Sequence, residues 1–301
     1  MTNSPAALRR SLESRFKNAS RATGQPSPQI RRRFFHQCYL ARVFTLPGND
    51  WVLKGGVGLA MRASSARHSK DIDLYRQDAI HDLETSIDQL ITAGLASDRD
   101  PFVFEVTRKG EILGGAGGAT LAVKCLLGPL ELDTFPIDLT TRHQIVGKLE
   151  QVTPEQLVQI PQVMPPPPML VYPLTDQIAD KLSALYETHS GQPSSRYRDL
   201  VDLILITLDH QEVDPDELHR ALEAQQTLRR VSLPRPLTPP GDHWRQRYRN
   251  LAIDTPGVPD RLANLENALT HIENAFREAL NHRKGAVDSQ PRPATGARDH
   301  L

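Results

Sequence analysis

Only two cysteines, Cys38 and Cys125, occur in the 301 residues of this chain. Two thiols cannot build a disulfide framework or a four-thiolate zinc site, so both of these devices are excluded. Such low cysteine usage is typical of a protein in a reducing compartment. The chain is long enough to bury a sizeable apolar core, and its hydrophobic content of 39% is ordinary for a globular protein.

Long apolar runs are also missing. No window approaches the roughly 18 continuous apolar residues that a membrane-spanning helix needs. Arg9 and Arg10 are not followed by an apolar segment, as they would be in a secretory signal. We therefore expect a cytoplasmic protein with no membrane partner. The sequence contains no internal repeat.

The chain has no net charge, because 36 Lys and Arg residues balance 36 Asp and Glu residues. This balance excludes a uniformly basic nucleic-acid coat and an acidic disordered chain. Locally the charge is uneven: residues 1–42 carry nine basic residues and one acidic residue (+8), residues 227–250 carry +5, and residues 199–224 carry −7. The basic blocks are either footprints for a polyanion or solvated helix faces, and the first block could also pair with the acidic one.

The spacing of apolar residues predicts an α+β (mixed α/β) fold, with a mixed sheet and flanking helices followed by a mostly helical C-terminal half. The Asp71–Tyr75 segment alternates polar and apolar residues and is interpreted as a strand at a sheet edge. The other predicted strands span residues 51–53, 102–107, 119–127 and 130–139. The predicted helices span residues 5–22, 28–44, 57–62, 79–93, 175–188, 195–208, 215–226, 242–252 and 259–282.

Four segments follow from this pattern. Basic helices over residues 1–46 pack on an α+β core over residues 47–160, and a helical domain over residues 161–283 follows. The Pro165–Pro168 run is predicted to be a stiff extended connection between the last two. The polar tail over residues 284–301 is predicted to be disordered.

A glycine turn and a pair of carboxylates form the sharpest local signal. Gly55 and Gly56 follow an apolar strand and precede a helix, a position where free backbone N–H groups bind anions. Asp71 and Asp73 are two residues apart in a strand, so their carboxylates share one face and repel each other. A divalent cation such as Mg²⁺ relieves that repulsion and also binds phosphates. Two exposed aspartates in a surface turn are the alternative.

A third carboxylate on a neighbouring strand would complete a metal clamp for in-line displacement at phosphorus. Asp138 is the better candidate, because it lies in the apolar run Phe135–Leu139. A charged residue in such a run is unusual unless it has a partner or a function. Asp133 is the competitor. Asp138 could instead be a strand-end aspartate that caps the next turn.

A second group of charged residues lies on the predicted helices. Lys181 falls in an amphipathic helix, and Arg198, Asp199 and Asp202 fall in the next one. The lysine is either a point charge for nucleotide phosphates, oriented by the other three side chains, or part of a pair of surface helices joined by ion pairs. Spacing alone favours neither interpretation.

Motifs at four places resemble the AbiEii/AbiGii nucleotidyltransferase toxin family. The run WVLKGGVGLAMRASSARHSKDIDLY is similar to its first motif, and TFPIDLTT is similar to the strand that carries its third aspartate. The stretch YPLTDQIADKLSALYETHSGQPSSRYRDLVDLILI resembles its later lysine and Arg-Asp-Leu-x-Asp motifs, and SLESRFKNASRATGQ resembles its leading helix. The resemblance covers roughly residues 5–282. It implies a fold related to DNA polymerase beta-like nucleotidyltransferases, with residues 47–160 as the nucleotidyltransferase core.

The resemblance also implies roles for individual residues. Asp71 and Asp73 become the metal-binding catalytic pair, with Asp138 as the third metal ligand and catalytic carboxylate. Lys181 and Asp202 complete the catalytic set. The residues expected to contact the nucleotide are Lys54, Gly55, Gly56, Ser69, Lys181, Arg198 and Asp199. The wider superfamily has Gly-Ser at the first turn, so Ser69 or Lys54 must replace that hydroxyl here.

These residues lead to one functional hypothesis with two alternatives. The resemblance implies the toxin of a bacterial toxin–antitoxin system, which uses Mg²⁺ or Mn²⁺ to transfer a nucleotide from an NTP to an RNA 3′ end, expected to be tRNA, and so blocks translation. A cognate antitoxin is the expected protein partner. One alternative is transfer to a protein or small-molecule hydroxyl, and the other is a non-catalytic binding module of the same fold.

Overall fold

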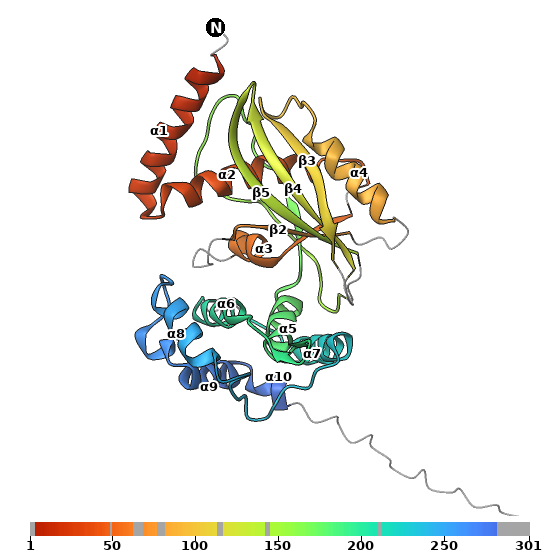
Figure 1. The fold of residues 1–301 in the computed structure, drawn as a ribbon, viewed down its shortest axis with the longest axis vertical. Coiled ribbons are helices and arrows are strands. Elements are labelled where there is room, and N and C mark those ends of the chain that lie inside the picture. Colours follow the sequence, from red (N-terminus) through yellow and green to blue (C-terminus); the bar gives the residue numbers. More distant parts are fainter. Residues whose placement is uncertain are drawn as a thin grey trace, which may run out of the picture.

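A seven-stranded mixed sheet and a separate layer of helices make up the molecule (Figure 1). This structure is a computed structural model, and it describes residues 4–48, 50–62, 69–76, 82–112, 117–141, 145–209 and 212–281. The strands are β1 Trp51–Lys54, β2 Ile72–Arg76, β3 Val103–Glu111, β4 Gly118–Leu127, β5 Leu130–Thr140, β6 Glu150–Val152, β7 Met169–Val171, β8 Thr188–His189 and β9 Gln192–Pro193. The helices are α1 Pro5–Thr23, α2 Ser27–Val43, α3 Gly55–Arg62, α4 Leu83–Gly94, α5 Leu174–Leu185, α6 Tyr197–Leu208, α7 Pro215–Arg229, α8 Trp244–Ile253, the 3₁₀ helix η1 Asp260–Ala263, α9 Leu265–Ala275 and α10 Arg277–Asn281.

The strand order β3-β4-β5-β2-β1-β7-β6 places β2 inside the sheet. β2 runs parallel to β5 and antiparallel to β1, so it has a hydrogen-bonded neighbour on each side. The prediction of a strand at residues 71–75 is confirmed, but its assignment to a sheet edge is wrong. Polar and apolar residues alternate there because one face of this interior strand carries polar side chains toward a cleft, not because the strand borders solvent.

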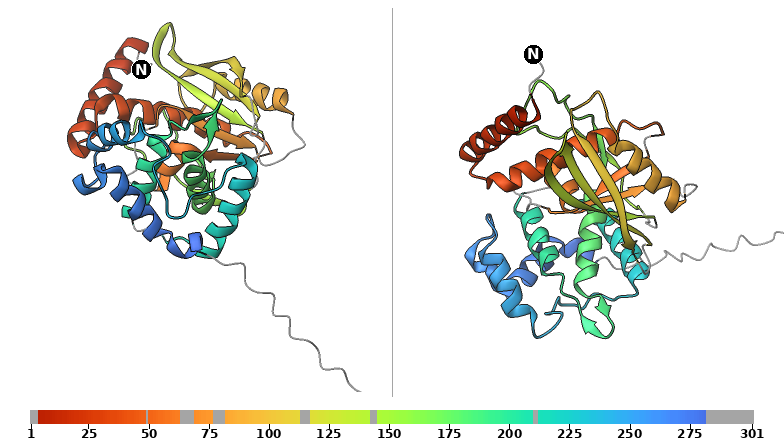
Figure 2. Two further views of the ribbon diagram at one scale, coloured as in Figure 1. Left: turned by 60° about the horizontal axis from the view of Figure 1, so that its bottom comes forward. Right: turned by 45° about the horizontal axis from the view of Figure 1, so that its top comes forward.

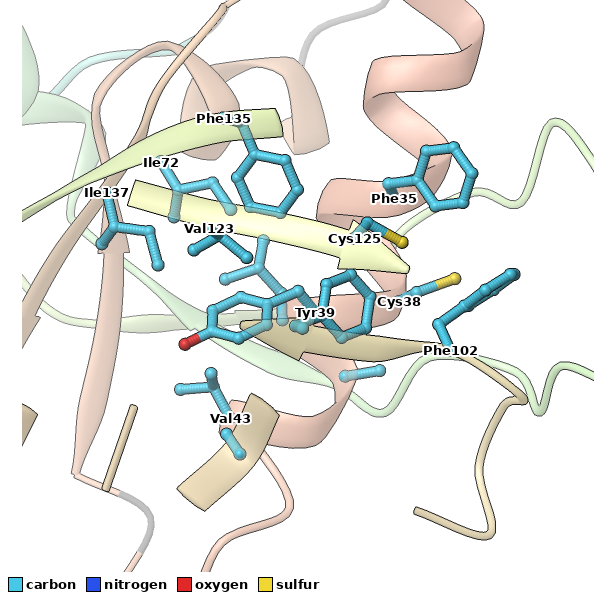
Figure 3. Packing of buried hydrophobic residues seen from close by; sticks show 14 of the residues in the cluster. Phe35, Cys38, Tyr39, Val43, Ile72, Phe102, Val123, Cys125, Phe135 and Ile137 are labelled. Carbon is cyan, nitrogen blue, oxygen red and sulfur yellow. The ribbon is translucent and has the colours of Figure 1, made fainter. Parts of the chain in front are cut away.

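The N-terminal helices pack on the sheet. The Ser4 hydroxyl caps α1 by accepting a hydrogen bond from the Ala7 N–H, and Gly24, with φ of 73°, ends the helix in the left-handed region. α2 then buries an aromatic face against the sheet, and Figure 3 shows Phe35 and Tyr39 beside Phe102 and Phe135. The sheet core therefore extends into the first 46 residues.

The proline run lies between two parts of the sheet rather than at the end of it. β7 follows the prolines directly and pairs in parallel with β1, while β6 pairs with β7 on its other side. β6 and β7 were not predicted, because each has only three residues and carries too short a pattern. Residues 169–171, which the sequence analysis assigned to the helical segment, thus belong to the sheet.

A second apolar cluster forms inside the helical layer, around α5, α6 and α9. Most predicted helices are confirmed, but the one over residues 259–282 is divided into η1, α9 and α10. Two short strands, β8 and β9, form a hairpin between α5 and α6 that was not predicted. The tail over residues 284–301 lies outside the described residues. Across the part of the chain that is described, no helix is long and apolar enough to cross a membrane.

Candidate active site

Four neighbouring strands place a row of polar side chains side by side. Asp73 on β2 pairs with Lys54 on β1 and with Asp138 on β5, and Asp138 pairs in turn with Thr120 on β4. Directly paired positions in a sheet point to the same face, so this row presents a lysine, two carboxylates and a hydroxyl together. Asp71 precedes Asp73 by two residues, immediately before β2.

Hydroxyl groups hold two of the three carboxylates. The Ser69 hydroxyl donates to Asp71 Oδ1 at 2.7 Å, and the Thr120 hydroxyl donates to Asp138 Oδ1 at 2.8 Å. Burial, together with the negative charges of Asp71 and Asp138, raises the pKa of Asp73 to about 7, although Lys54 opposes this shift. The carboxylates are therefore crowded, and a cation would relieve their mutual repulsion.

The donor set fits a hard divalent cation. Carboxylate oxygens are the ligands that Mg²⁺ prefers, and Mg²⁺ usually takes one or two of them together with phosphate oxygens and water. Among the described residues, no group of three or more His, Cys, Asp or Glu side chains converges as a complete metal cluster. Asp71 and Asp73 supply two carboxylates of the kind that Mg²⁺ takes.

Asp133 lies elsewhere. It is buried, and Arg32 of α2 donates to both of its oxygens at 2.9 Å. Arg31 also approaches it, at 4.0 Å. Asp133 is paired with Cys125 on β4 rather than with β2, so it takes no part in the row around Asp73. The structure thus places Asp138, and not Asp133, beside the carboxylate pair.

The glycine turn leaves no room for side chains. Gly55 has φ of 61°, and a Cβ on it would lie 1.8 Å from Asp73 Oδ2. A Cβ on Gly56 would lie 2.8 Å from the Cβ and hydroxyl of Ser69. Glycine is required at both positions because the backbone at the start of α3 packs directly against the acidic row.

Lys54 is buried at the end of β1. Its ammonium lies 4.6 Å from the centroid of the Tyr172 ring, a cation–π contact. Burial lowers the pKa of Lys54 to about 8, and Asp180 and Asp73 act against this shift. Lys54 therefore adds positive charge directly beside the glycine turn.

The helical layer contributes a buried ion-pair cluster. Lys181 of α5 donates to Asp199 Oδ1 at 2.9 Å and to Asp202 Oδ2 at 2.8 Å, and Arg196 also donates to Asp199. Burial alone would lower the pKa of Lys181, but the two carboxylates outweigh it and raise that pKa well above its usual value. Asp199 shows the converse, since Lys181 and Arg196 lower its pKa despite burial. The ion pairs between the two helices are therefore present but buried, so of the two alternatives the one with surface helices does not hold.

A single cleft of about 1490 Å³ collects these groups. Its lining includes every residue that the sequence analysis selected for the site: Lys54, Gly55, Gly56, Ser69, Asp71, Asp73, Asp138, Lys181, Arg198, Asp199 and Asp202. The turn between α1 and α2 and the segment from Arg247 to Gly257 also line it. Figure 2 shows these two segments on the same side of the molecule.

Several residues that contact the site residues were missed by sequence reasoning. Gln177 donates to the Gly55 carbonyl, Thr120 holds Asp138, and Arg196 contacts Asp199 from the start of α6. Gln177 precedes Lys181 by one helical turn, which was a usable signal. Nothing local marks Thr120, because only strand register brings it to Asp138.

The arginines of the basic N-terminal block have different partners. Arg31 and Arg32 face Asp133, so pairing with residues 199–224 is wrong for them. Arg33 contacts Glu155 and lines the cleft. Phe34 and Phe35 follow these arginines in the chain, and both are buried in the core.

The chain is similar to known proteins in sequence and in fold. A family model described as the nucleotidyl transferase AbiEii toxin of a type IV toxin–antitoxin system matches residues 38–284. The structure of MenT4, a nucleotidyltransferase toxin from Mycobacterium tuberculosis, is similar with a TM-score of 0.55 and 16% identity, over 89% of this chain and 90% of that chain. JHP933 from Helicobacter pylori is similar with a TM-score of 0.48 and 15% identity, over 85% of this chain and 95% of that chain. No curated protein matches the sequence.

Proposed function

This chain belongs to the AbiEii nucleotidyltransferase toxin family of type IV toxin–antitoxin systems, and on that premise we propose that it transfers a nucleoside monophosphate from an NTP to the 3′ hydroxyl of tRNA. The observation that carries the proposal is the row of Lys54, Asp73 and Asp138 beside a glycine turn. Blocking the tRNA 3′ end would stop translation. The family also implies a cognate antitoxin that counteracts the toxin.

The triphosphate would lie along the glycine turn. The N–H groups at the start of α3 offer hydrogen bonds to phosphate oxygens, and Lys54 adds a positive charge at the same place. Ser69 lies beside the second glycine of the turn, and its hydroxyl, which donates to Asp71, would have to turn away from that carboxylate to donate to a phosphate oxygen. Lys181 and the exposed Arg198 also line the cleft and would contact the outer phosphates.

In the reaction, the 3′ hydroxyl oxygen forms a bond to the α-phosphorus while the bond from that phosphorus to the bridging oxygen breaks. Pyrophosphate leaves, and the Asp138 carboxylate accepts the hydroxyl proton. Thr120 holds one oxygen of Asp138, so the other oxygen remains available for this role. Mg²⁺ or Mn²⁺, when bound by Asp71 and Asp73 with Asp138 beside them, would neutralise charge on the α-phosphate and the leaving group.

The size of the cleft favours a macromolecular acceptor. Sites for small ligands usually measure about 300–1,000 Å³, whereas this cleft measures about 1490 Å³. Arg33, Lys70 and Arg247 also line it, and they could contact a phosphate backbone.

The test is to incubate the purified protein with each of the four NTPs, labelled at the α-phosphate, and total tRNA. We expect labelled tRNA and released pyrophosphate. Control tRNA whose terminal diol has been oxidised by periodate should accept no label, because it lacks the 3′ hydroxyl. Label on a protein or a small molecule, with unlabelled tRNA, would contradict the proposed acceptor.

A further inference from the structure

Gln177 connects the two layers of the molecule at the cleft. It lies in the first turn of α5, is only 3% exposed, and donates from Nε2 to the Gly55 carbonyl at 2.6 Å. A carbonyl can only accept, so the amide nitrogen must face it. The Gln177 Oε1 atom is buried without a hydrogen-bond partner among the described residues, and the bond to Gly55 therefore sets the orientation of this amide.

The glycine turn is held from two sides. On one side Gly55 packs so closely against Asp73 that a Cβ would overlap the carboxylate. On the other side the Gln177 amide binds the Gly55 carbonyl. The peptide that opens α3 is therefore fixed between the acidic row of the sheet and the first turn of α5.

The same face of α5 also carries Lys181. Residues four apart on a helix are neighbours, and both Gln177 and Lys181 line the cleft. Lys181 is anchored to Asp199 and Asp202 of α6. One helix thus connects the phosphate-binding turn of the sheet to the ion-pair cluster of the helical layer.

We propose that Gln177 is a positioning residue for the nucleotide. By binding the Gly55 carbonyl, it fixes the position of the N–H groups of the glycine turn relative to Lys181. One triphosphate can then contact both layers at once. The inference rests on the proposed function, because it assumes that the turn binds an NTP. It does not require Gln177 to touch the nucleotide.

The experiment compares Gln177→Met with Gln37→Met in the full chain. Gln37 is a matched control, since it is 8% exposed, donates from Nε2 to the Glu155 carbonyl at 2.8 Å and does not line the cleft. Each variant loses one buried hydrogen bond to a backbone carbonyl. We expect a similar fall in Tm for both. Only Gln177→Met should bind NTP more weakly and show a raised KM, by roughly three- to tenfold, the effect of one hydrogen bond.

A second variant, Gln177→Glu, keeps the shape of the side chain but cannot donate as a carboxylate, so its NTP affinity should fall at least as far. Equal NTP affinities for the Gln177 variants and Gln37→Met would overturn the positioning role. Failure of both Gln177 variants to fold would also overturn it, since Gln177 would then be a requirement of the fold. A wild-type protein that binds no NTP would instead overturn the proposed function and, with it, this inference.

Discussion

At the scale of single residues, Asp73 decides what the site can do. It is flanked by Lys54 and Asp138 on the two neighbouring strands, and Asp71 lies two residues before it. Its raised pKa reflects burial and the two nearby carboxylates. A cation bound beside these carboxylates would relieve their repulsion, and this gives the row a physical reason to bind a cation.

Asp71→Ala and Asp73→Ala should each abolish nucleotide transfer and growth inhibition. Loss of a group that stabilises charge in the transition state costs about 10²–10³ in rate, and loss of a metal ligand should cost at least as much. Labelled transfer and growth assays measure both effects. Asp254→Asn, which changes another aspartate that lines the cleft, is the control and should keep wild-type activity. Wild-type toxicity of the Asp71 and Asp73 double variant would argue against an enzymatic toxin.

At the scale of elements, the pairing of α5 with α6 depends on Lys181. Lys181→Ala should raise the KM for NTP and lower the rate, and Lys181→Arg should restore only part of both, because a guanidinium is not a compact point charge. The variant should also lose about 3–5 kcal/mol of unfolding free energy, since two buried carboxylates lose the lysine that they share. Unchanged kinetics would remove Lys181 from the nucleotide site.

The stability that this cluster provides should depend on pH. Folding lowers the pKa of Asp199, so its contribution is present above the unfolded value of about 3.9 and is lost as pH falls below that value. Folding raises the pKa of Lys181, so its contribution is present below about 10.4 and is lost only as pH rises through the raised value. Urea unfolding should therefore show a large difference between wild type and Lys181→Ala at pH 7 and a smaller one at pH 3. A difference independent of pH would show that packing, not charge, holds the pair.

The arginines of α2 should separate into two classes. Arg33→Gln should weaken tRNA binding and flatten its salt dependence by up to about one unit, because Arg33 lines the cleft and would neutralise one phosphate. Arg32→Gln should instead lower Tm, because it releases buried Asp133. NTP binding should hardly change in either variant. If tRNA affinity depends on salt equally in wild type and Arg33→Gln, RNA does not contact Arg33. The basic stretch over residues 227–250 would then be the expected RNA contact.

At the scale of the whole molecule, the sheet and the helical layer share one cleft, so a ligand that contacts both should stabilise the entire fold. NTP together with Mg²⁺ should raise Tm, with a gain of about 2.7 kcal/mol at a ligand concentration 100 times Kd. EDTA should reduce this gain and stop transfer, and added Mg²⁺ should restore both. The Asp71 and Asp73 double variant serves as the control. A Tm gain in wild type that is unaffected by EDTA would contradict metal-dependent binding.

The sequence by itself determined the residue types and most of the elements. The glycine pair after β1, the spacing of Asp71 and Asp73, and the helix that carries Lys181 are local patterns, and local patterns depend on backbone periodicity within one segment. These patterns selected the glycine turn and the carboxylate pair before any contact was known, and the family resemblance assigned roles to Lys181 and the remaining site residues. All of them line the cleft.

Only the tertiary structure decided which of these residues meet. The register between β2 and β5 places Asp138 beside Asp73. The packing of α2 brings Arg32 into contact with Asp133. The partners of Lys181 and the contact from Gln177 to Gly55 likewise join segments far apart in the chain. Such contacts follow from how strands align and layers pack, a property of the whole molecule that no single segment encodes.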